Sequence, residues 1–225
     1  MNDKLKTSKL RPANRQIIGI GYKMGSGKDA LADCLVKEYG YVKYRFSDPI
    51  KAVAAAMFGY TDRQMNTHEG KAEYDQVARR TVRDSLQLIG ERMRNAFGAD
   101  IWVRSLLHRI EESSDSRIVI PDVRYLNEQE SVHLRGVTCK ISRPREKRGL
   151  TGVETGLELH ATEIQLDSLP DSRWHAVIDN SGDDKAALFQ YAGNLVMLYD
   201  GIRCGKTSNV SMDADGLQCC TNEEG

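Results

Sequence analysis

A glycine-rich stretch near the start of the chain, "GSGKD" at residues 25–29, has the residue types that bind phosphate groups. Small residues let backbone N–H groups turn inward around a phosphate, and Lys28 adds a full positive charge. The spacing departs from the usual G-x-x-x-x-G-K-[ST] pattern, because Tyr22 replaces the first glycine and Asp29 replaces the hydroxyl residue. Tyr22 is tolerable there if its backbone keeps an ordinary conformation. The alternative is a glycine-rich turn with no ligand.

Two carboxylates could hold a divalent cation beside this loop. Asp29 stands where a hydroxyl normally touches Mg²⁺, and a carboxylate can hold that ion directly or through water. Asp122 ends the apolar run "IVIP", which is the place of the acid that reaches Mg²⁺ in P-loop enzymes. Each has a structural alternative, since Asp29 suits the first turn of a helix and Asp122 could cap the next one.

Arginines are concentrated in "RRTVRDSLQLIGERMR", residues 79–94. Arg79, Arg83 and Arg94 could line one face of a helix, and Gln87 follows Arg83 by one turn. Such a face suits a small anionic ligand. A solvated amphipathic helix would show the same spacing.

Two further features could serve either in ligand binding or in the structure alone. Trp102 is either a platform on which a base stacks or part of the core. Arg143, Arg145 and Arg148 open a glycine-rich charged segment that we interpret as a mobile loop. A loop of this kind can close over phosphates and exclude water, and we assign Arg143 to ATP binding. A loop that is merely solvated is the alternative.

Composition limits the kind of protein and of ligand. The chain has 225 residues, 40% hydrophobic and 28% charged, with a formal net charge of zero. These values predict one globular domain of ordinary size and disfavour a partner such as duplex nucleic acid, which usually requires a basic excess. The five cysteines have no zinc spacing, and no apolar run is long enough to span a membrane. We therefore expect a cytoplasmic protein with reduced thiols.

The elements that must position these residues alternate between strand and helix. Apolar patterning predicts strands at residues 16–21, 41–46, 116–122, 136–144 and 175–180. It predicts helices at 29–39, 48–58, 77–97, 101–110, 125–135, 160–166 and 183–198, with an irregular polar stretch at 60–75. This alternation predicts an α/β fold, a parallel sheet with helices on both faces, whose ligands bind beyond the carboxyl ends of the strands. Residues 1–15 are expected to be a flexible leader and 204–225 a disordered tail.

Taken together, these pieces resemble the deoxynucleoside monophosphate (dNMP) kinases of tailed bacteriophages. The resemblance covers most of residues 16–200. It rests on an ordered set of motifs: "KMGSGKDALAD", "FSDPIKAVAAAMFG", "RRTVRDSLQLIGERMRNAFGADIWV", "IVIPDVRYLNEQE", "ISRP" and "HATE…VIDNSG". Members of the family transfer the γ-phosphoryl group of ATP, with Mg²⁺, to a 2′-deoxynucleoside 5′-monophosphate.

The resemblance implies a fold and a set of site residues. The fold is the three-layer P-loop kinase fold over residues 16–203, with a helical NMP-binding insertion at about 60–110 and a mobile lid loop at about 143–163. The residues that match the phosphate loop are Gly25, Ser26, Gly27, Lys28, Asp29 and Ala30. Those that match the catalytic element are Asp122, Arg124 and Glu128, with Asp29 and Asp122 as the Mg²⁺ ligands. Those that match the acceptor element are Arg83, Gln87 and Gly90, with Trp102 as a base contact and Arg124 at the acceptor phosphate.

The chain departs from the family pattern at two positions, and other functions stay open. Ala30 stands where the family usually has Thr, and Glu91 follows Gly90 where the family often has Thr. The first departure bears on the phosphate or metal contacts and the second on the choice of acceptor. A phosphomevalonate-type kinase and a nucleotide-binding regulatory module without turnover are the alternatives. The resemblance also implies a phage-encoded protein in the host cytoplasm, and a homodimer is left open.

Overall fold

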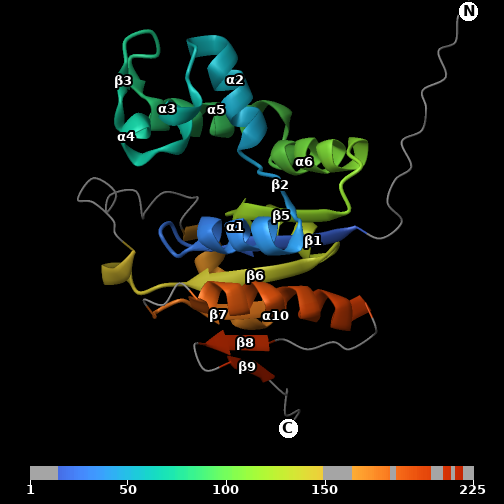
Figure 1. The fold of residues 1–225 in the computed structure, drawn as a ribbon. Coiled ribbons are helices and arrows are strands. Elements are labelled where there is room, and N and C mark those ends of the chain that lie inside the picture. Colours follow the sequence, from blue (N-terminus) through green and yellow to red (C-terminus); the bar gives the residue numbers. More distant parts are fainter. Residues whose placement is uncertain (1–14, 149–163, 183–185, 204–209, 214–215, 220–225) are drawn as a thin grey trace, which may run out of the picture. The chain divides into compact units, whose positions relative to one another are not determined.

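The computed structural model describes residues 15–148, 164–182, 186–203, 210–213 and 216–219 (Figure 1). Backbone contacts divide the chain into two compact units. Residues 1–44 and 111–225 form the first, here called the sheet unit, and Arg45–Ile110 form the second, the helical unit. The predicted NMP-binding region, about 60–110, lies inside the helical unit. Each unit is described separately below.

The sheet unit contains a seven-stranded sheet in the order β2-β5-β1-β6-β7-β8-β9. Its strands are β1 (Gln16–Gly21), β2 (Val42–Lys43), β5 (Arg117–Val123), β6 (Val137–Ser142), β7 (Ala176–Asp179), β8 (Val210–Asp213) and β9 (Gly216–Cys219). All neighbouring strands pair in parallel except β8 and β9, which are antiparallel. The predicted parallel sheet is therefore confirmed.

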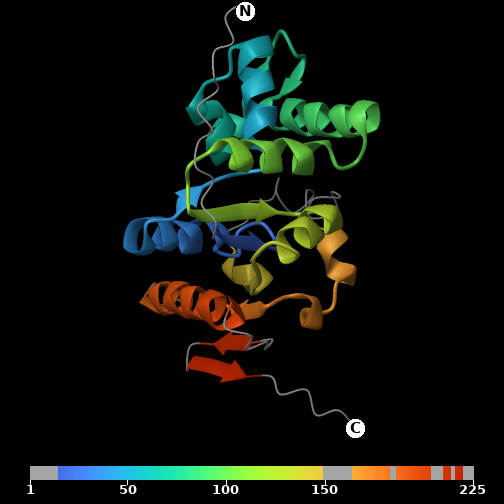
Figure 2. The ribbon, with the colours of Figure 1, turned by 90° about the vertical axis from the view of Figure 1, so that its right-hand side faces the viewer.

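Helices cover both faces of this sheet, as predicted (Figures 1 and 2). On one face, α1 (Lys28–Tyr39) and α10 (Ala186–Arg203) lie side by side. The main core lies beneath them and includes Ile18, Ile20, Leu31, Leu35, Cys139, Ile178, Tyr191 and Leu195. On the other face, α7 (Leu126–His133) packs so closely on β1 that a Cβ atom at Gly19 would lie 2.7 Å from Val132.

The central strand pair β1–β5 contains an irregularity. Gly19 lies opposite Ile120, but Gly21 lies opposite Val123, so β5 has one residue more than β1 over this interval. A bulge accommodates proline, which cannot donate to a regular ladder, and this explains Pro121 in a central strand. A bulge also redirects the side chains beside it, and Asp122 is the next residue.

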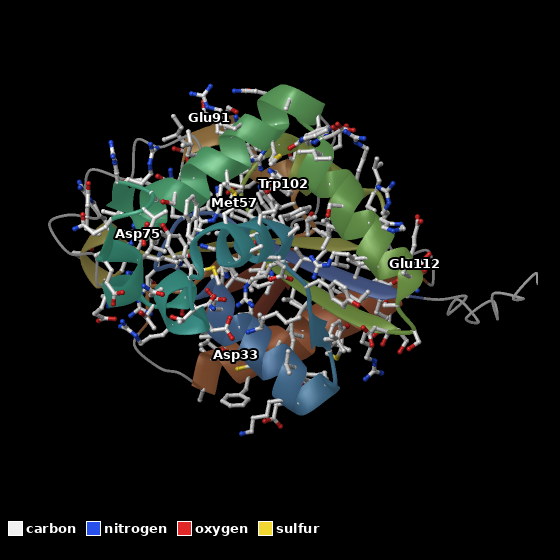
Figure 3. The ribbon with its side chains drawn as sticks, turned by 90° about the horizontal axis from the view of Figure 1, so that it is seen from above. Asp33, Met57, Asp75, Glu91, Trp102 and Glu112 are labelled. Carbon is white, nitrogen blue, oxygen red and sulfur yellow. The ribbon has the colours of Figure 1, made fainter. Side chains whose placement is uncertain are left out.

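The helical unit begins at Arg45, within the second predicted strand. It contains α2 (Asp48–Phe58), α3 (Asp62–Asn66), α4 (His68–Ala72), the short hairpin β3 (Tyr74–Asp75) and β4 (Arg80–Thr81), α5 (Val82–Phe97) and α6 (Ile101–Glu112). Ala54, Tyr60, Met65, Val82 and Ile89 form its core. Figure 3 shows Trp102 among the side chains between α5 and α6.

Several predicted boundaries in and around this unit are wrong. The strand predicted at 41–46 is only two residues long. The stretch 60–75, expected to be irregular, contains α3, α4 and β3. The two helices are short and begin at the N-caps Thr61 and Thr67. The helix predicted from residue 77 begins at Val82, because Thr81 accepts a hydrogen bond from the Asp84 N–H and caps it.

The ends of the chain and the loop also differ from expectation. Of the leader predicted at 1–15, Arg15 alone is described, and its guanidinium donates to the carbonyl oxygens of Ser113 and Asp115. The prediction of a disordered tail is wrong for residues 210–213 and 216–219, since β8 extends the sheet by pairing with β7 and β9 pairs with β8. Most of the predicted lid, residues 149–163, and part of the helix predicted at 160–166 lie outside the described residues. Residues Gln165–Ser168 form a 3₁₀ turn, η3.

Candidate nucleotide-binding site

The strand order places the candidate site at the carboxyl ends of β1 and β5. These strands are neighbours, yet the helix that follows β1 covers one face of the sheet and the helix that follows β5 covers the other. Such a switch point leaves a crevice beyond the strand ends, where ligands of open α/β sheets bind. Gly21 precedes the phosphate loop and lies opposite Val123, the residue that separates Asp122 from Arg124 in the sequence. The two predicted motifs are thus brought together by strand pairing.

The phosphate loop turns through three residues with positive φ. These are Tyr22 at 100°, Gly25 at 73° and Gly27 at 105°. The condition stated for Tyr22, an ordinary backbone conformation, is therefore not met. The loop has a left-handed backbone at the position where the usual pattern has glycine, and here tyrosine adopts that conformation. The centroid of its ring lies 4.4 Å from Lys140 Nζ and 5.3 Å from Lys23 Nζ.

Lys28, the first residue of α1, is buried inside the loop. Its ammonium donates to the carbonyl oxygens of Tyr22, at 3.0 Å, and Lys23, and lies 3.4 Å from Ser26 Oγ. Burial, and next the positive charge of Arg124, lower the pKa of Lys28 well below its usual value. Burial thus disfavours the charged form of Lys28, and a phosphate group added beside it would be strongly attracted to the ammonium and would stabilise its charge.

Asp29 and Asp122 both act on the cations of this pocket. Burial lowers the pKa of both Lys28 and Arg124, and the negative charges of Asp29 and Asp122 partly offset this by raising both pKa values. Among the described residues, no three His, Cys, Asp or Glu side chains gather into a metal-binding group. Two carboxylates near a phosphate loop still suit Mg²⁺, because this ion is commonly held by one or two carboxylates, water and substrate phosphates.

Glu128 contacts the backbone of Arg124 and is almost fully buried, with 2% of its surface exposed. Its Oε2 accepts hydrogen bonds from the backbone N–H of Arg124, at 2.9 Å, and of Tyr125, at 3.1 Å. These bonds cap the start of α7 and fix the backbone of Arg124. The catalytic role predicted for Glu128 stays a prediction, but this geometry shows how it can position Arg124.

The turn after β6 places Arg148 at the phosphate loop, and the assignment of Arg143 to ATP binding stays a prediction. The backbone of Arg148 packs so closely on Gly25 that a Cβ atom there would lie 2.5 Å from the Arg148 carbonyl oxygen. The positive charge of Arg148 also contributes to lowering the pKa of Lys28. Arg143 Nε donates to the carbonyl oxygen of Lys147, within the same turn. Spacing alone could not rank three arginines that enter one loop.

Asn180 is a second residue at the loop whose role the sequence did not suggest. It follows β7, is 95% buried, and donates from Nδ2 to the carbonyl oxygen of Ser26 at 2.9 Å. The motif "VIDN" was a usable signal, because a polar residue at the carboxyl end of a strand falls at the ligand edge of the sheet.

The predicted acceptor residues all belong to the helical unit, apart from Arg124. Arg83 and Gln87 lie one turn apart on α5 and are half-buried. The structure joins Gly90 and Trp102, since Trp102 Nε1 donates to the Gly90 carbonyl oxygen at 3.0 Å. Trp102 is 5% exposed, so its indole is largely used in packing α6 against α5.

A separate groove of about 310 Å³ lies between α2 and α3. It is lined by Arg45, Asp48, Lys51, Ala52, Ala55, Asp62, Met65 and Asn66. Asp48 pairs with Arg109 at 2.8 Å, and Lys51 donates to Asn66 Oδ1 at 2.7 Å. None of the predicted acceptor residues lines this groove, so it does not bear on their assignment.

Comparison with known proteins supports the fold. No protein-family model and no curated protein matches the chain. Its structure is similar to that of TT1252 from Thermus thermophilus, with 20% sequence identity and a TM-score of 0.53 over 82% of this chain and 97% of that chain. It is more distantly similar to a shikimate kinase from Acinetobacter baumannii, with 15% identity and a TM-score of 0.47 over 86% of this chain and 96% of that one. Only the first likeness is close enough to argue from, and at this identity it shows the α/β fold alone.

Proposed function

We propose that the chain is an ATP-dependent dNMP kinase, which converts ATP and a dNMP into ADP and a dNDP. The observation that carries the proposal is the buried Lys28 ammonium inside a phosphate loop, with Asp122 and Arg124 at the end of the paired strand. Lysine, acid and arginine in this arrangement match the needs of phosphoryl transfer between two anions. The family resemblance supplies the acceptor class.

The acceptor phosphate is already an anion, so the reaction needs no general base. Catalysis has to come from holding two polyanions in line and neutralising their repulsion. Lys28 and the loop N–H groups would hold the β- and γ-phosphates, and Arg124 would neutralise charge on the transferring group. When bound between Asp29, Asp122 and the phosphates, Mg²⁺ would supply further positive charge.

The Lys28 ammonium can exchange its present hydrogen-bond acceptors for phosphate oxygens. In the described structure its ammonium is satisfied by loop oxygens rather than by a carboxylate. Phosphate oxygens carry more negative charge than carbonyl oxygens, and hydrogen bonds to charged acceptors are stronger. A bound nucleotide would therefore draw Lys28 away from the Tyr22 and Lys23 carbonyls.

On the acceptor side, Arg83 and Gln87 are the better-placed candidates of the helical unit. Both are half-buried on one face of α5, where a guanidinium can bind a phosphate and an amide can read a base. Trp102 is buried and already hydrogen-bonded, so we assign it to the support of α5 rather than to the base.

The test is a coupled assay of ADP release with Mg-ATP against ribonucleoside monophosphates, deoxynucleoside monophosphates and phosphomevalonate. We expect dNMP-dependent release, and we expect Asp122→Ala to lower turnover by about 100-fold or more. Release with phosphomevalonate alone would assign the chain to the other kinase class. Tight ATP binding without release for any acceptor would indicate a regulatory module.

A further inference from the structure

We propose that Asn180 is a positioning residue that aims the Gly27 N–H into the phosphate loop. The inference deepens the proposed function and rests on it, since it concerns how the same loop holds the phosphates of ATP. Asn180 comes from β7, two strands away from the strand that carries the loop.

The sheet fixes Asn180 before it contacts the loop. Its backbone N–H donates to the Ser142 carbonyl oxygen at 2.8 Å, which continues the β6–β7 pairing by one residue. The residues on either side are also held: the Asp179 carbonyl oxygen accepts from Tyr191 OH at 3.1 Å, and Asp179 Oδ1 accepts from the Ser181 N–H at 2.9 Å. The side chain is thus presented from a rigid strand end.

Its amide group fixes one peptide of the loop. Asn180 Nδ2 donates to the Ser26 carbonyl oxygen at 2.9 Å, in a buried position. A peptide unit is planar and trans, so its C=O and N–H point in opposite directions. Because the Ser26 carbonyl oxygen is directed at Asn180, the N–H of Gly27 is directed away from Asn180.

The conformation of Gly27 agrees with this role. Its φ is +105°, which a glycine adopts readily, and a Cβ atom there would lie 2.5 Å from Asn180 Nδ2. The close approach leaves no room for a side chain at position 27, so glycine there lets the asparagine reach the 26–27 peptide. Without the amide donor, that peptide could turn its carbonyl oxygen toward the phosphate, which would repel it.

The experiment compares Asn180→Ala with wild type by calorimetric titration of ADP. Tyr41→Phe is the matched control, because it removes a partly buried hydrogen bond, to Gln16 Oε1 at 3.1 Å, at the opposite end of the sheet. We expect Asn180→Ala to raise the Kd for ADP by about tenfold, the effect of one charge-assisted hydrogen bond, and Tyr41→Phe to leave it unchanged.

A second readout separates positioning from a loss of stability. In amide-proton NMR spectra, ADP should shift the Gly27 N–H resonance strongly in the wild type and in Tyr41→Phe, and much less in Asn180→Ala. Asn180→Asp keeps the shape of the side chain but lacks the N–H donor, so it should show the same loss of ADP affinity and of the Gly27 shift. It replaces the alanine variant in the experiment if that variant does not fold. Wild-type affinity and an unchanged Gly27 shift in these variants would overturn the assignment. Failure of the wild type to bind ADP would instead overturn the proposed function, and this assignment with it.

Discussion

The ammonium group of Lys28 donates a 3.0 Å hydrogen bond to the carbonyl oxygen of Tyr22, the residue that replaces the first glycine of the usual phosphate-loop pattern. Tyr22 itself has a φ of 100°. A left-handed backbone is unfavourable for a residue with a side chain, and strain of this kind persists where the surroundings hold it. The adjacent Lys140 and Lys23 provide such surroundings.

The first prediction concerns this strain. Tyr22→Gly and Tyr22→Ala both remove the ring, but only glycine adopts the positive φ without cost. We expect the glycine variant to be more stable than the alanine variant by about 1 kcal/mol in urea unfolding. The control is Ala56→Gly, on the exposed side of α2, where glycine should instead be the less stable residue. An alanine variant at position 22 as stable as the glycine variant would contradict a strained Tyr22.

The second prediction concerns pH and His175. Its ring stacks on His133 with centroids 4.2 Å apart, and its Nδ1 accepts a hydrogen bond from the Thr138 N–H at 3.1 Å. Burial, and next the His133 ring, lower the pKa of His175 from 6.5 to about 4. Between these values the unfolded chain binds more protons than the folded one. The free energy of unfolding should therefore rise with pH from about 4 to about 6.5 and then level off.

The pH dependence can be assigned by substitution. His175→Asn keeps an acceptor for the Thr138 N–H but does not titrate, so the increase in stability between about pH 4.5 and pH 6.5 should become smaller. His108→Asn, at an exposed position on α6, should leave it as in the wild type. Urea unfolding at several pH values measures both, and identical slopes for His175→Asn and the wild type would refute the assignment.

The sequence predicted the sheet and the polar residues at its carboxyl edge well, because both depend on local signals. The strand at 16–21 is a short apolar run, and Asp122 comes directly after the apolar run "IVIP" within β5. The bulge at Pro121 could not be predicted, since it depends on the pairing of β5 with β1. The same reason hid Asn180, whose contact with Ser26 joins residues 154 positions apart.

Two features that the sequence did not reveal share a physical cause. The positive φ of Tyr22 is imposed by the loop and by lysines on two different segments, not by the propensity of tyrosine. The strand β8 forms by pairing with β7, so its residues need no apolar run of their own. In both cases tertiary pairing overrides the local preference.

The third prediction separates packing from base recognition at Trp102. Trp102→Phe loses the hydrogen bond to Gly90 and part of the packing, so it should lower the free energy of unfolding by about 2 kcal/mol. The KM for dNMP should change by less than about threefold. Gln87→Ala should show the opposite pattern, a KM raised about tenfold with little loss of stability. A large KM increase in Trp102→Phe at unchanged stability would restore the base-contact role.

The fourth prediction concerns the C-terminal strands. Removal of residues 205–225 deletes β8 and β9 and leaves the edge of β7 unpaired at Ala176, Val177 and Ile178. We expect the melting temperature to fall by about 4 °C or more. Removal of 220–225 alone leaves both strands intact and should leave the melting temperature unchanged. Equal melting temperatures for the long truncation and the full chain would show that these strands do not stabilise the sheet.

The most direct test of the account is the transfer of labelled γ-phosphate from Mg-ATP to each of the four common dNMPs by the wild type and by Lys28→Met. The side chain of methionine fills a similar volume but cannot hold a phosphate. We predict labelled dNDP with at least one acceptor, and a turnover number for Lys28→Met that is lower than that of the wild type by about 100-fold or more. Failure of the wild type to label any dNMP, or near-native transfer by Lys28→Met, would contradict the account.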